Sequence, residues 1–354
     1  MPLTTVNPAL LDTQAQYTGF KNRLINSAMV IDQRNAGASV TPTSGQYTLD
    51  RWITYVGAAS KLSIQRSSVA PTGFNNSALI TSLSAYTVGA SETFLFGHKI
   101  EGFNFADMGW GTAAAATITI SFWVRSSLTG TFGGSLGNGA DNRWYPFSYT
   151  ISAANTWEQK TITVAGDTTG TWVGATNGIG LNVYFNLGTG ATLSGPAGVW
   201  SSTTYYSNTG AVSVVGTNGA TFYITGVQLE KGSTATSFDY RPYGTELALC
   251  QRYYQNIGGQ TLTGFAEGST NLAATIFFYQ QMRAAPTCSI RSGNTLSVRS
   301  PGGDYNAASP VLANTTTGTN AIWTNISGFS GLTVNAVVTS RLTNQDAIAA
   351  SAEL

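Results

Sequence analysis

Apolar and polar residues alternate with a period of two along much of the chain between about residues 45 and 245. Segment 116–125 is the clearest case, because an apolar set alternates there with a mixed set. The apolar set is Ile118, Ile120, Phe122 and Val124, and the mixed set is Thr119, Ser121, Trp123 and Arg125. Successive side chains of a strand point to opposite faces, so the pattern predicts a strand with the apolar set in a core and the mixed set outside.

A second alternating segment, 180–187, predicts a strand with the same division of its faces. The residues expected to point inward are Leu181, Val183, Phe185 and Leu187, and those expected to point outward are Asn182, Tyr184 and Asn186. Further strands are predicted at 62–67, 157–164 and 221–230. Short strands separated by Gly, Asn and Ser clusters are typical of an all-β sandwich or barrel.

Helical periodicity is nearly absent, with one exception at residues 245–254. This segment follows Pro242 and Gly244, and Thr245 is a candidate N-cap, so we predict a connector helix over 244–256. Spacings of three and four separate Leu247, Cys250 and Tyr254. Such a stripe either packs on its own domain or forms the seam between subunits of an oligomer, and both interpretations stay open.

The chain divides into four parts on these patterns. A large β-sandwich is predicted over 22–243, followed by the connector helix. A second, smaller C-terminal β-sandwich is predicted over 257–354, with strands at 273–281, 287–291, 321–326 and 332–341. Residues 1–21 carry two prolines and no periodic apolar pattern, so we interpret them as an N-terminal arm ordered only by contact with something else.

Composition narrows the class of protein. Charged residues make up 9% of the 354 residues, against about a quarter in an average protein, while hydrophobic residues make up 42%. The net charge is +1 and no basic run occurs, which argues against nucleic-acid binding. No stretch approaches the roughly 18 apolar residues of a membrane span, and the N-terminus lacks a signal-peptide pattern. We therefore expect synthesis in a cytoplasm and no membrane insertion.

The residues that enzymes and metal sites need are scarce. His98 is the only histidine, so a Ser/His/Asp or Cys/His arrangement is not expected. Cys250 and Cys288 are too few for a disulfide framework or a zinc site and are expected to be buried thiols. No phosphate-binding loop motif occurs. The sequence predicts no cofactor, no metal and no catalytic residue.

Three stretches resemble a known family, the tail-fibre and minor virion proteins of bacteriophages that are built around a jelly roll similar to a carbohydrate-binding module. The first stretch is 22–37 (NRLINSAMVIDQRNAG), followed by 47–52 (YTLDRW). The second is 224–238 (ITGVQLEKGSTATSF), and the third is 241–254 (RPYGTELALCQRYY). Together they bracket residues 22–254.

This resemblance implies a jelly roll for 22–243 and a virion protein made in the host cytoplasm. It implies an oligomer, which we expect to be a homotrimeric tail fibre with Leu247, Cys250 and Tyr254 at the interface. The arm would then dock on other virion proteins, and host-surface polysaccharide would be the external partner. A head decoration or fibre-anchoring protein without a ligand is the alternative from another class.

Sugar binding by a β-sandwich needs aromatic faces for the apolar side of a pyranose and amide or guanidinium groups for its hydroxyls. The candidate glycan-binding residues of these types are Trp123, Arg125, Trp144, Tyr145, Asn182, Tyr184 and Asn186. Arg143, Trp144 and Tyr145 also form a run in a context rich in Gly and Asn. The alternative is that a loop or a neighbouring subunit covers these aromatic rings.

A polysaccharide depolymerase is the remaining alternative, because glycoside hydrolysis needs only two carboxylates about 5–10 Å apart. The acids of the larger domain that come into question are Asp107, Asp141, Glu158 and Asp167, none of which forms a close pair in the sequence. Glu230 alone is too little for a calcium site, which takes six to eight oxygens. We therefore expect a protein that is not an enzyme.

Overall fold

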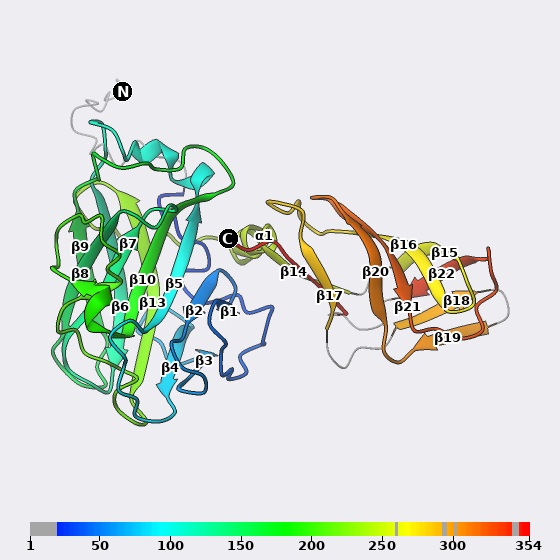
Figure 1. Cartoon of the computed structure of the whole chain (residues 1–354), viewed down its shortest axis with the longest axis horizontal. Helices are drawn as coiled ribbons and strands as arrows, with labels where there is room; N and C mark the ends of the chain where they lie inside the picture. Colours follow the sequence, from blue (N-terminus) through cyan, green and yellow to red (C-terminus); the bar gives the residue numbers. More distant parts are fainter. Residues whose placement is uncertain (1–19, 259–260, 292–295, 301–302, 342–346) are drawn as a thin grey trace, which may run out of the picture. The chain divides into compact units, whose positions relative to one another are not determined.

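The computed structural model describes residues 20–258, 261–291, 296–300, 303–341 and 347–354. The chain folds into two compact units (Figure 1). The described part of the first unit is 20–30, 37–48 and 52–243, and the second unit contains 31–36, 49–51 and the described residues from 244 onward. Nineteen of the 21 residues of the predicted arm, 1–19, lie outside the described residues.

The first unit is a sandwich of two sheets (Figure 1). The six-stranded sheet has the order β1 (Gln46–Leu49), β2 (Trp52–Tyr55), β5 (Thr93–Glu101), β10 (Ile179–Thr189), β7 (Gly130–Gly137) and β8 (Trp144–Ile151). The five-stranded sheet has the order β3 (Leu62–Ser67), β4 (Ser77–Ser82), β13 (Thr221–Lys231), β6 (Ile118–Ser126) and β9 (Glu158–Val164). The short strands β11 (Ser194–Gly195) and β12 (Ser207–Asn208) form a separate parallel pair, and short 3-10 helices lie at Gly102–Asn104, Ala106–Met108 and Ala191–Leu193.

The core between the two sheets follows the predicted alternation. The predicted inward set of β6 is fully buried, and the Phe122 ring packs edge-on against Tyr149 of β8 and Phe185 of β10, each with ring centroids 5.0 Å apart. The inward set of β10, which includes Leu181 and Val183, is also fully buried. Burial of large apolar side chains from both sheets explains why these segments form strands of one sandwich. The predicted jelly-roll β-sandwich is confirmed.

The second unit contains a nine-residue helix and two further sheets. The helix is α1 (Tyr243–Gln251). The three-stranded sheet has the order β14 (Tyr254–Ile257), β23 (Ile348–Ser351) and β17 (Thr287–Ile290). The seven-stranded sheet has the order β19 (Gly303–Ala307), β18 (Leu296–Ser300), β22 (Val337–Arg341), β15 (Thr261–Ala266), β16 (Asn271–Phe277), β21 (Ala321–Ser327) and β20 (Val311–Thr317). One apolar core includes side chains of both sheets, so the predicted second, smaller β domain is confirmed.

Two element boundaries differ from the sequence prediction. The helix ends at Gln251 rather than extending to 256, because Tyr254 already belongs to β14 and pairs there with Ser351. The strand predicted at 332–341 begins only at Val337, since Asn335 has a positive φ of 63° and belongs to the preceding turn. Both boundaries depend on pairing and turn geometry rather than on apolar periodicity.

A cluster of charged and aromatic side chains lies inside the second unit. Glu353 makes ion pairs with Arg34, at 2.7 Å, and with Arg51. The guanidinium of Arg34 stacks over the ring of Tyr254 at 3.7 Å, and that of Arg51 over Tyr253 at 3.6 Å. We refer to these five residues as the arginine cluster.

The arginine cluster corrects the expected subunit seam. Arg34 covers Tyr254, which is buried, and the side chain of Cys250 is 0% exposed. Leu247 is half-buried. Two of the three expected interface side chains are thus packed inside their own unit.

Burial also raises the pKa of the Asp50 carboxyl, which accepts hydrogen bonds from Gln33, to about 6.

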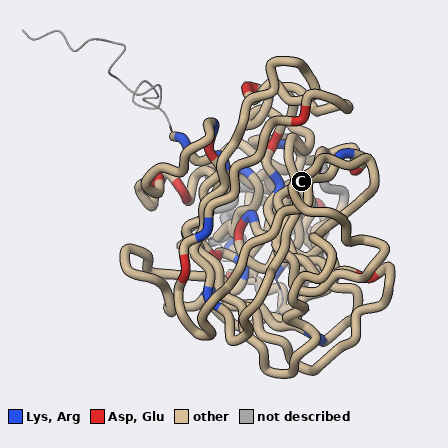
Figure 2. Tube along the Cα trace, turned by 90° about the vertical axis from the view of Figure 1, so that its left-hand side faces the viewer, with Lys and Arg blue, Asp and Glu red and all other residues tan. Residues whose placement is uncertain are grey.

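Charged residues are few and scattered along the trace (Figure 2). Among the described residues, no helix has both the length and the apolar character that crossing a membrane requires.

Candidate functional site

The candidate site is a pocket of about 230 Å³ on the outer face of the six-stranded sheet. Its floor comes from β2, β5 and β10, and its walls from the turn after β7 and the loop before β12. The lining residues are Tyr55, Thr93, Leu95, Lys99, Gly139, Asp141, Ile179, Asn182, Tyr184 and Tyr206. Three tyrosines, one amide and one charge of each sign therefore meet in one small concave surface.

Two glycines allow aromatic rings to lie flat on this face of the sheet. Tyr184 of β10 pairs with Gly97 of β5, where an added Cβ would lie 2.2 Å from Tyr184 Cδ1. Trp144 of β8 pairs with Gly137 of β7, where an added Cβ would lie 2.4 Å from the indole ring. Glycine inside a strand commonly marks such a close approach. A glycine inside a predicted strand could therefore have indicated in the sequence where a ring packs on the sheet, which the alternation of apolar and polar residues does not indicate.

The rings form a continuous row across the sheet. Tyr184 stacks on Trp144 with centroids 5.8 Å apart and an interplanar angle of 22°. Tyr55 meets Tyr184 edge-on at 5.7 Å, and Tyr206 meets Trp144 edge-on at 4.8 Å. Tyr55 and Tyr206 remain half-buried, whereas Tyr184 is 5% and Trp144 1% exposed. The accessible aromatic surface of the site thus comes mainly from Tyr55 and Tyr206.

The polar side chains of the pocket are held in defined positions. Asn182 Nδ2 donates to the Asn138 carbonyl at 3.1 Å, and Asn182 Oδ1 accepts from the Tyr184 hydroxyl at 3.1 Å. Burial raises the pKa of Tyr184 well above its usual value. Burial, with the negative charge of Asp141, raises the pKa of Tyr206 to about 12. Both hydroxyls therefore stay protonated at neutral pH and can act as donors and acceptors.

Asp141 lies at one side of the pocket, in a turn where its φ is 61°. Partial desolvation raises the pKa of its carboxyl above the usual value. The nearby indole N–H of Trp144 and the positive charge of Lys99 act in the opposite direction but are weaker. Asp141 thus gives the pocket a hydrogen-bond acceptor, while Lys99 provides donors.

The structure does not bring all of the predicted glycan-binding residues together in one place. Asn182, Tyr184 and Trp144 belong to the pocket or its aromatic row. Trp123 and Arg125 lie on β6, on the outer face of the other sheet, where Arg125 Nε donates to the Asn155 carbonyl at 2.9 Å. The pocket and the pair on β6 therefore lie on opposite sides of the sandwich.

Asn186 corrects the expectation of an outward, available amide. It lies on the predicted face of β10 but is buried. Its Oδ1 accepts from the backbone N–H of Gly188 at 3.0 Å and from the Thr189 hydroxyl at 2.7 Å, and its Nδ2 donates to the Val212 carbonyl at 3.3 Å. Asn186 therefore supports the end of β10 rather than a ligand.

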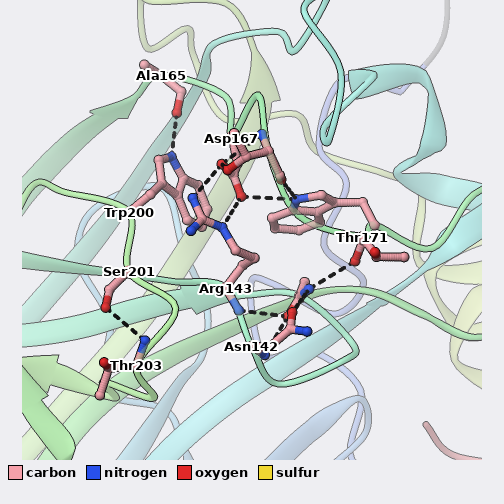
Figure 3. Close-up of polar contacts among 11 residues, drawn as sticks. Asn142, Arg143, Ala165, Asp167, Thr171, Trp200, Ser201 and Thr203 are labelled. Carbon is pink, nitrogen blue, oxygen red and sulfur yellow. Dashed lines mark hydrogen bonds and ion pairs between the residues drawn. The ribbon is translucent and has the colours of Figure 1, made fainter.

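Arg143 and Tyr145 are turned away from Trp144 by strand alternation. Arg143 forms a two-pronged ion pair with Asp167, with Nε–Oδ2 at 2.7 Å and Nη2–Oδ1 at 2.8 Å (Figure 3). The Trp172 indole N–H donates to the same carboxylate at 3.2 Å. Tyr145 packs on Trp200, whose N–H donates to the Ala165 carbonyl at 3.0 Å. The three residues of this run therefore do not form one surface. Trp144 is buried, whereas Arg143 and Tyr145 contact Asp167 and Trp200, which lie in loops.

The other carboxylates of the first unit are engaged elsewhere. Asp107 pairs with Arg23 at 2.7 Å, and Glu158 with Lys160 at 2.6 Å. Glu230 is buried and accepts from the Thr236 hydroxyl at 2.6 Å and its backbone N–H at 2.9 Å. Among the described residues, no group of three or more His, Cys, Asp or Glu side chains could hold a metal ion.

The residues that sequence reasoning missed are Tyr55, Lys99 and Tyr206. Tyr55 and Lys99 lie on neighbouring strands of the six-stranded sheet, and Tyr206 lies in the loop before β12. Tyr55 is the last residue of a four-residue strand, too short for a clear alternation, and no periodic pattern marks Tyr206. These three residues meet at the pocket because of the order of strands in the sheet, and the pattern of the sequence does not predict that order.

Comparison with solved structures finds similar β folds. An enzymatically active domain of tailspike protein 4 from bacteriophage CBA120 has 11% identity and a TM-score of 0.33, covering 60% of this chain and 21% of that chain. This chain therefore spans about a fifth of that protein. The family 11 carbohydrate-binding module of a Clostridium thermocellum cellulase has 12% identity and a TM-score of 0.29, covering 57% of this chain and 99% of that chain.

The N-terminal cellulose-binding domain of Cellulomonas fimi β-1,4-glucanase C has 13% identity and a TM-score of 0.28, covering 52% of this chain and 90% of that chain. The sequence matches no protein-family model and no curated protein. Identities and TM-scores in this range assign neither a ligand nor an activity to this chain.

Proposed function

We propose that this chain is a fibre-type structural protein of a bacteriophage virion that attaches to a host-surface glycan through the pocket on the six-stranded sheet. The observation that carries the glycan part is the convergence of Tyr55, Tyr184 and Tyr206 with Asn182 in one concave surface. Lys99 and Asp141 complete the set of polar groups.

The chemistry of the pocket suits a sugar. A pyranose has apolar C–H faces and a rim of hydroxyls, so it needs ring faces or edges beside fixed donors and acceptors. Tyr55 and Tyr206 provide accessible rings, and Asn182 and Asp141 provide fixed polar groups. The volume of about 230 Å³ lies below the roughly 300–1,000 Å³ of pockets for drug-sized ligands, which favours one or two sugar rings in the open part of the site.

The proposed virion setting is supported by the sequence stretches that resemble phage fibre proteins. Hydrogen bonds within the first unit link these stretches. Asn22 Nδ2 donates to the Val227 carbonyl at 2.9 Å, and Arg241 Nη1 donates to the Leu24 carbonyl at 2.9 Å. The first stretch thus pairs with the other two, which gives a physical reason for their joint occurrence in one chain.

We further propose that the chain is not an enzyme. A glycosidase of the common type needs an acid pair about 5–10 Å apart, and Asp141 is the one carboxylate among the described residues that line the pocket. Asp107, Glu158 and Asp167 each form an ion pair outside it. Release of reducing ends from host polysaccharide would identify the alternative, a depolymerase.

Binding at the pocket is tested by a glycan array with the intact protein and its Tyr55→Ala variant. We expect the variant to bind the best glycan about five-fold or more weakly, because it loses an accessible ring that contributes about 1 kcal/mol or more. Tyr55 is half-buried, so the variant should remain folded.

The matched control is Tyr240→Ala, which removes a tyrosine that is 57% exposed and does not line the pocket. Its binding should equal that of the wild type. A comparable loss of glycan binding in the variant Trp123→Ala would instead indicate a binding surface on β6. No array signal for the wild type, together with virion labelling by an antibody, would favour the decoration protein without a ligand.

The proposed homotrimer is supported by an apolar face of the seven-stranded sheet. Phe265 pairs with Val337, and Phe277 and Trp323 lie on the same face by strand alternation. All four side chains are 40–66% exposed, which is unusual for apolar residues gathered on one surface. Burial of this face in an interface would replace the expected seam at the helix.

Light scattering tests the oligomer. We expect a mass near three chains of 37.1 kDa, and dissociation in the variant with Phe277→Asp and Val337→Asp because the new charges would be buried at the interface. A mass near one chain for the wild type would contradict the trimer. An unchanged mass of the double variant would contradict this choice of interface.

A further inference from the structure

The turn that follows β7, residues 138–142, forms one wall of the pocket. Gly139 and Asp141 of this turn line the pocket. A Cβ added at Gly139 would lie 2.3 Å from the Ile179 carbonyl oxygen, so the turn packs directly against the beginning of β10. Asp141 has a positive φ of 61°, which Asp and Asn adopt more readily than most other residues with a side chain. The position of the Asp141 carboxylate therefore depends on how this turn is held.

The side chain of Asn138 holds the turn from inside, where it is 0% exposed. Its Oδ1 accepts from the backbone N–H groups of Asn142 and Arg143, at 3.0 and 3.1 Å. Its Nδ2 donates to Asn142 Oδ1 at 2.7 Å and to the Thr171 carbonyl at 3.0 Å. An amide side chain offers two donor hydrogens and two acceptor lone pairs, and Asn138 uses all four.

The backbone of Asn138 joins this wall of the pocket to its floor. The Asn138 carbonyl accepts from Asn182 Nδ2 at 3.1 Å and from the Asp141 N–H at 3.3 Å. Asn182 in turn accepts from the Tyr184 hydroxyl. Residues of the wall and of the floor thus share one acceptor, so a shift of Asn138 displaces the wall relative to the floor.

Two contacts hold the turn independently of Asn138. The Thr204 hydroxyl donates to the Asp141 carbonyl at 3.3 Å. The ion pair of Arg143 with Asp167 joins the residue after the turn to the loop before β10 (Figure 3). Loss of the Asn138 side chain should therefore loosen the turn without unfolding the first unit.

We propose that Asn138 is a positioning residue of the glycan site, which fixes Asp141 at the pocket wall as the acceptor for a sugar hydroxyl. Asn138 is fully buried, so it acts on a ligand through Asp141, whose side chain is exposed and lines the pocket. A fixed acceptor favours binding because less side-chain entropy is lost when the ligand arrives. The inference rests on the proposed glycan-binding function and deepens it, because it assigns part of the affinity to a residue behind the pocket wall.

A double-mutant cycle tests this role, with the glycan of the strongest array signal as the ligand and titration calorimetry as the measurement. We expect Asp141→Gly to weaken binding about ten-fold or more, since it deletes a charged acceptor while glycine keeps the positive φ. Asn138→Ala should weaken binding about five-fold, because the carboxylate loses its fixed position. In the Asp141→Gly background, Asn138→Ala should cause a further loss of less than about two-fold, because no carboxylate is left to position.

The matched control is Asn22→Ala, which removes another buried amide of the first unit, 3% exposed. The Asn22 amide also makes four hydrogen bonds, to Ser27 Oγ at 2.8 Å and the Val227 carbonyl at 2.9 Å, and from the backbone N–H groups of Leu24 at 3.0 Å and Leu229 at 3.1 Å. Asn22→Ala should lower the unfolding temperature about as much as Asn138→Ala, but leave the glycan affinity within about two-fold of the wild type.

Asn142→Ala makes the same test with a milder change, should Asn138→Ala not fold. Asn142 is exposed, and its Oδ1 accepts one of the two hydrogen bonds that Asn138 Nδ2 donates. This variant should weaken binding about two- to five-fold, and again only where the Asp141 carboxylate is present.

Wild-type affinity of Asn138→Ala or of Asp141→Gly, or an equal loss from Asn138→Ala with and without the Asp141 carboxylate, would overturn the role of Asn138 while leaving binding in the pocket intact. A loss of affinity in Asn22→Ala as large as that in Asn138→Ala would overturn it too, because stability alone would then explain both. Failure of the wild type to bind any glycan would instead refute the proposed glycan-binding function, and with it this inference.

Discussion

Replacement of Arg51 by methionine is expected to lower the free energy of unfolding of the second unit by about 3–5 kcal/mol, the range seen when one partner of a buried ion pair is removed. Arg51 is 0% exposed, pairs with Glu353 and stacks over Tyr253. Methionine fills most of the volume but leaves the buried Glu353 carboxylate with one guanidinium fewer. Urea unfolding of the full chain, followed by circular dichroism, measures the change.

The control for this prediction is Arg299→Met. Arg299 pairs with Asp304 at 2.9 Å, but the side chains are 76% and 62% exposed. Exposed pairs of this kind contribute about 0–1 kcal/mol, so the control should unfold close to the wild type. Equal effects of the two variants would show that the arginine cluster does not stabilise the unit.

Addition of a single methyl group at Gly97 is expected to abolish glycan binding and to lower the free energy of unfolding by about 1–3 kcal/mol or more. The alanine Cβ would lie 2.2 Å from Tyr184 Cδ1 and 2.7 Å from the Val183 carbonyl oxygen. The backbone of β10 can yield little because it pairs with β7 on its other side. The Tyr184 ring must therefore leave its position, and because this ring lines the pocket, the pocket floor changes shape.

Gly174→Ala is the matched control, because no atom lies within 4 Å of a Cβ added there. Thermal unfolding and the glycan array should both give wild-type results for it. Retention of full binding by Gly97→Ala would mean that the Tyr184 ring is not part of the binding surface.

Alternation of side chains predicted the faces of the strands but not their exposure. Asn182, Tyr184 and Asn186 lie on the face of β10 opposite to the core, as their period of two predicts. They are nevertheless buried, because neighbouring loops and rings cover this part of the sheet. The period of a strand carries no information about segments that return to it from elsewhere in the chain.

The helix shows the same limit in another form. Spacings of three and four identified a helix near Leu247, and α1 is there. The sequence could not indicate that Tyr254 leaves it for β14, because the partner in β23, Ser351, is 97 residues away. The spacing of Leu247, Cys250 and Tyr254 fits either packing on its own domain or a subunit seam, and the structure packs Cys250 inside its own unit.

The route of the chain has a consequence for how such proteins can exchange parts. The chain passes between its two units after residues 30, 36, 48, 51 and 243, so two short N-terminal pieces belong to the C-terminal unit. A recombination event that joined a foreign C-terminal region at residue 244 would leave Arg34 and Arg51 behind. A C-terminal region without an acid at this place would leave two guanidinium groups without their ion pair, so residues 31–51 restrict which C-terminal regions could replace residues 244–354.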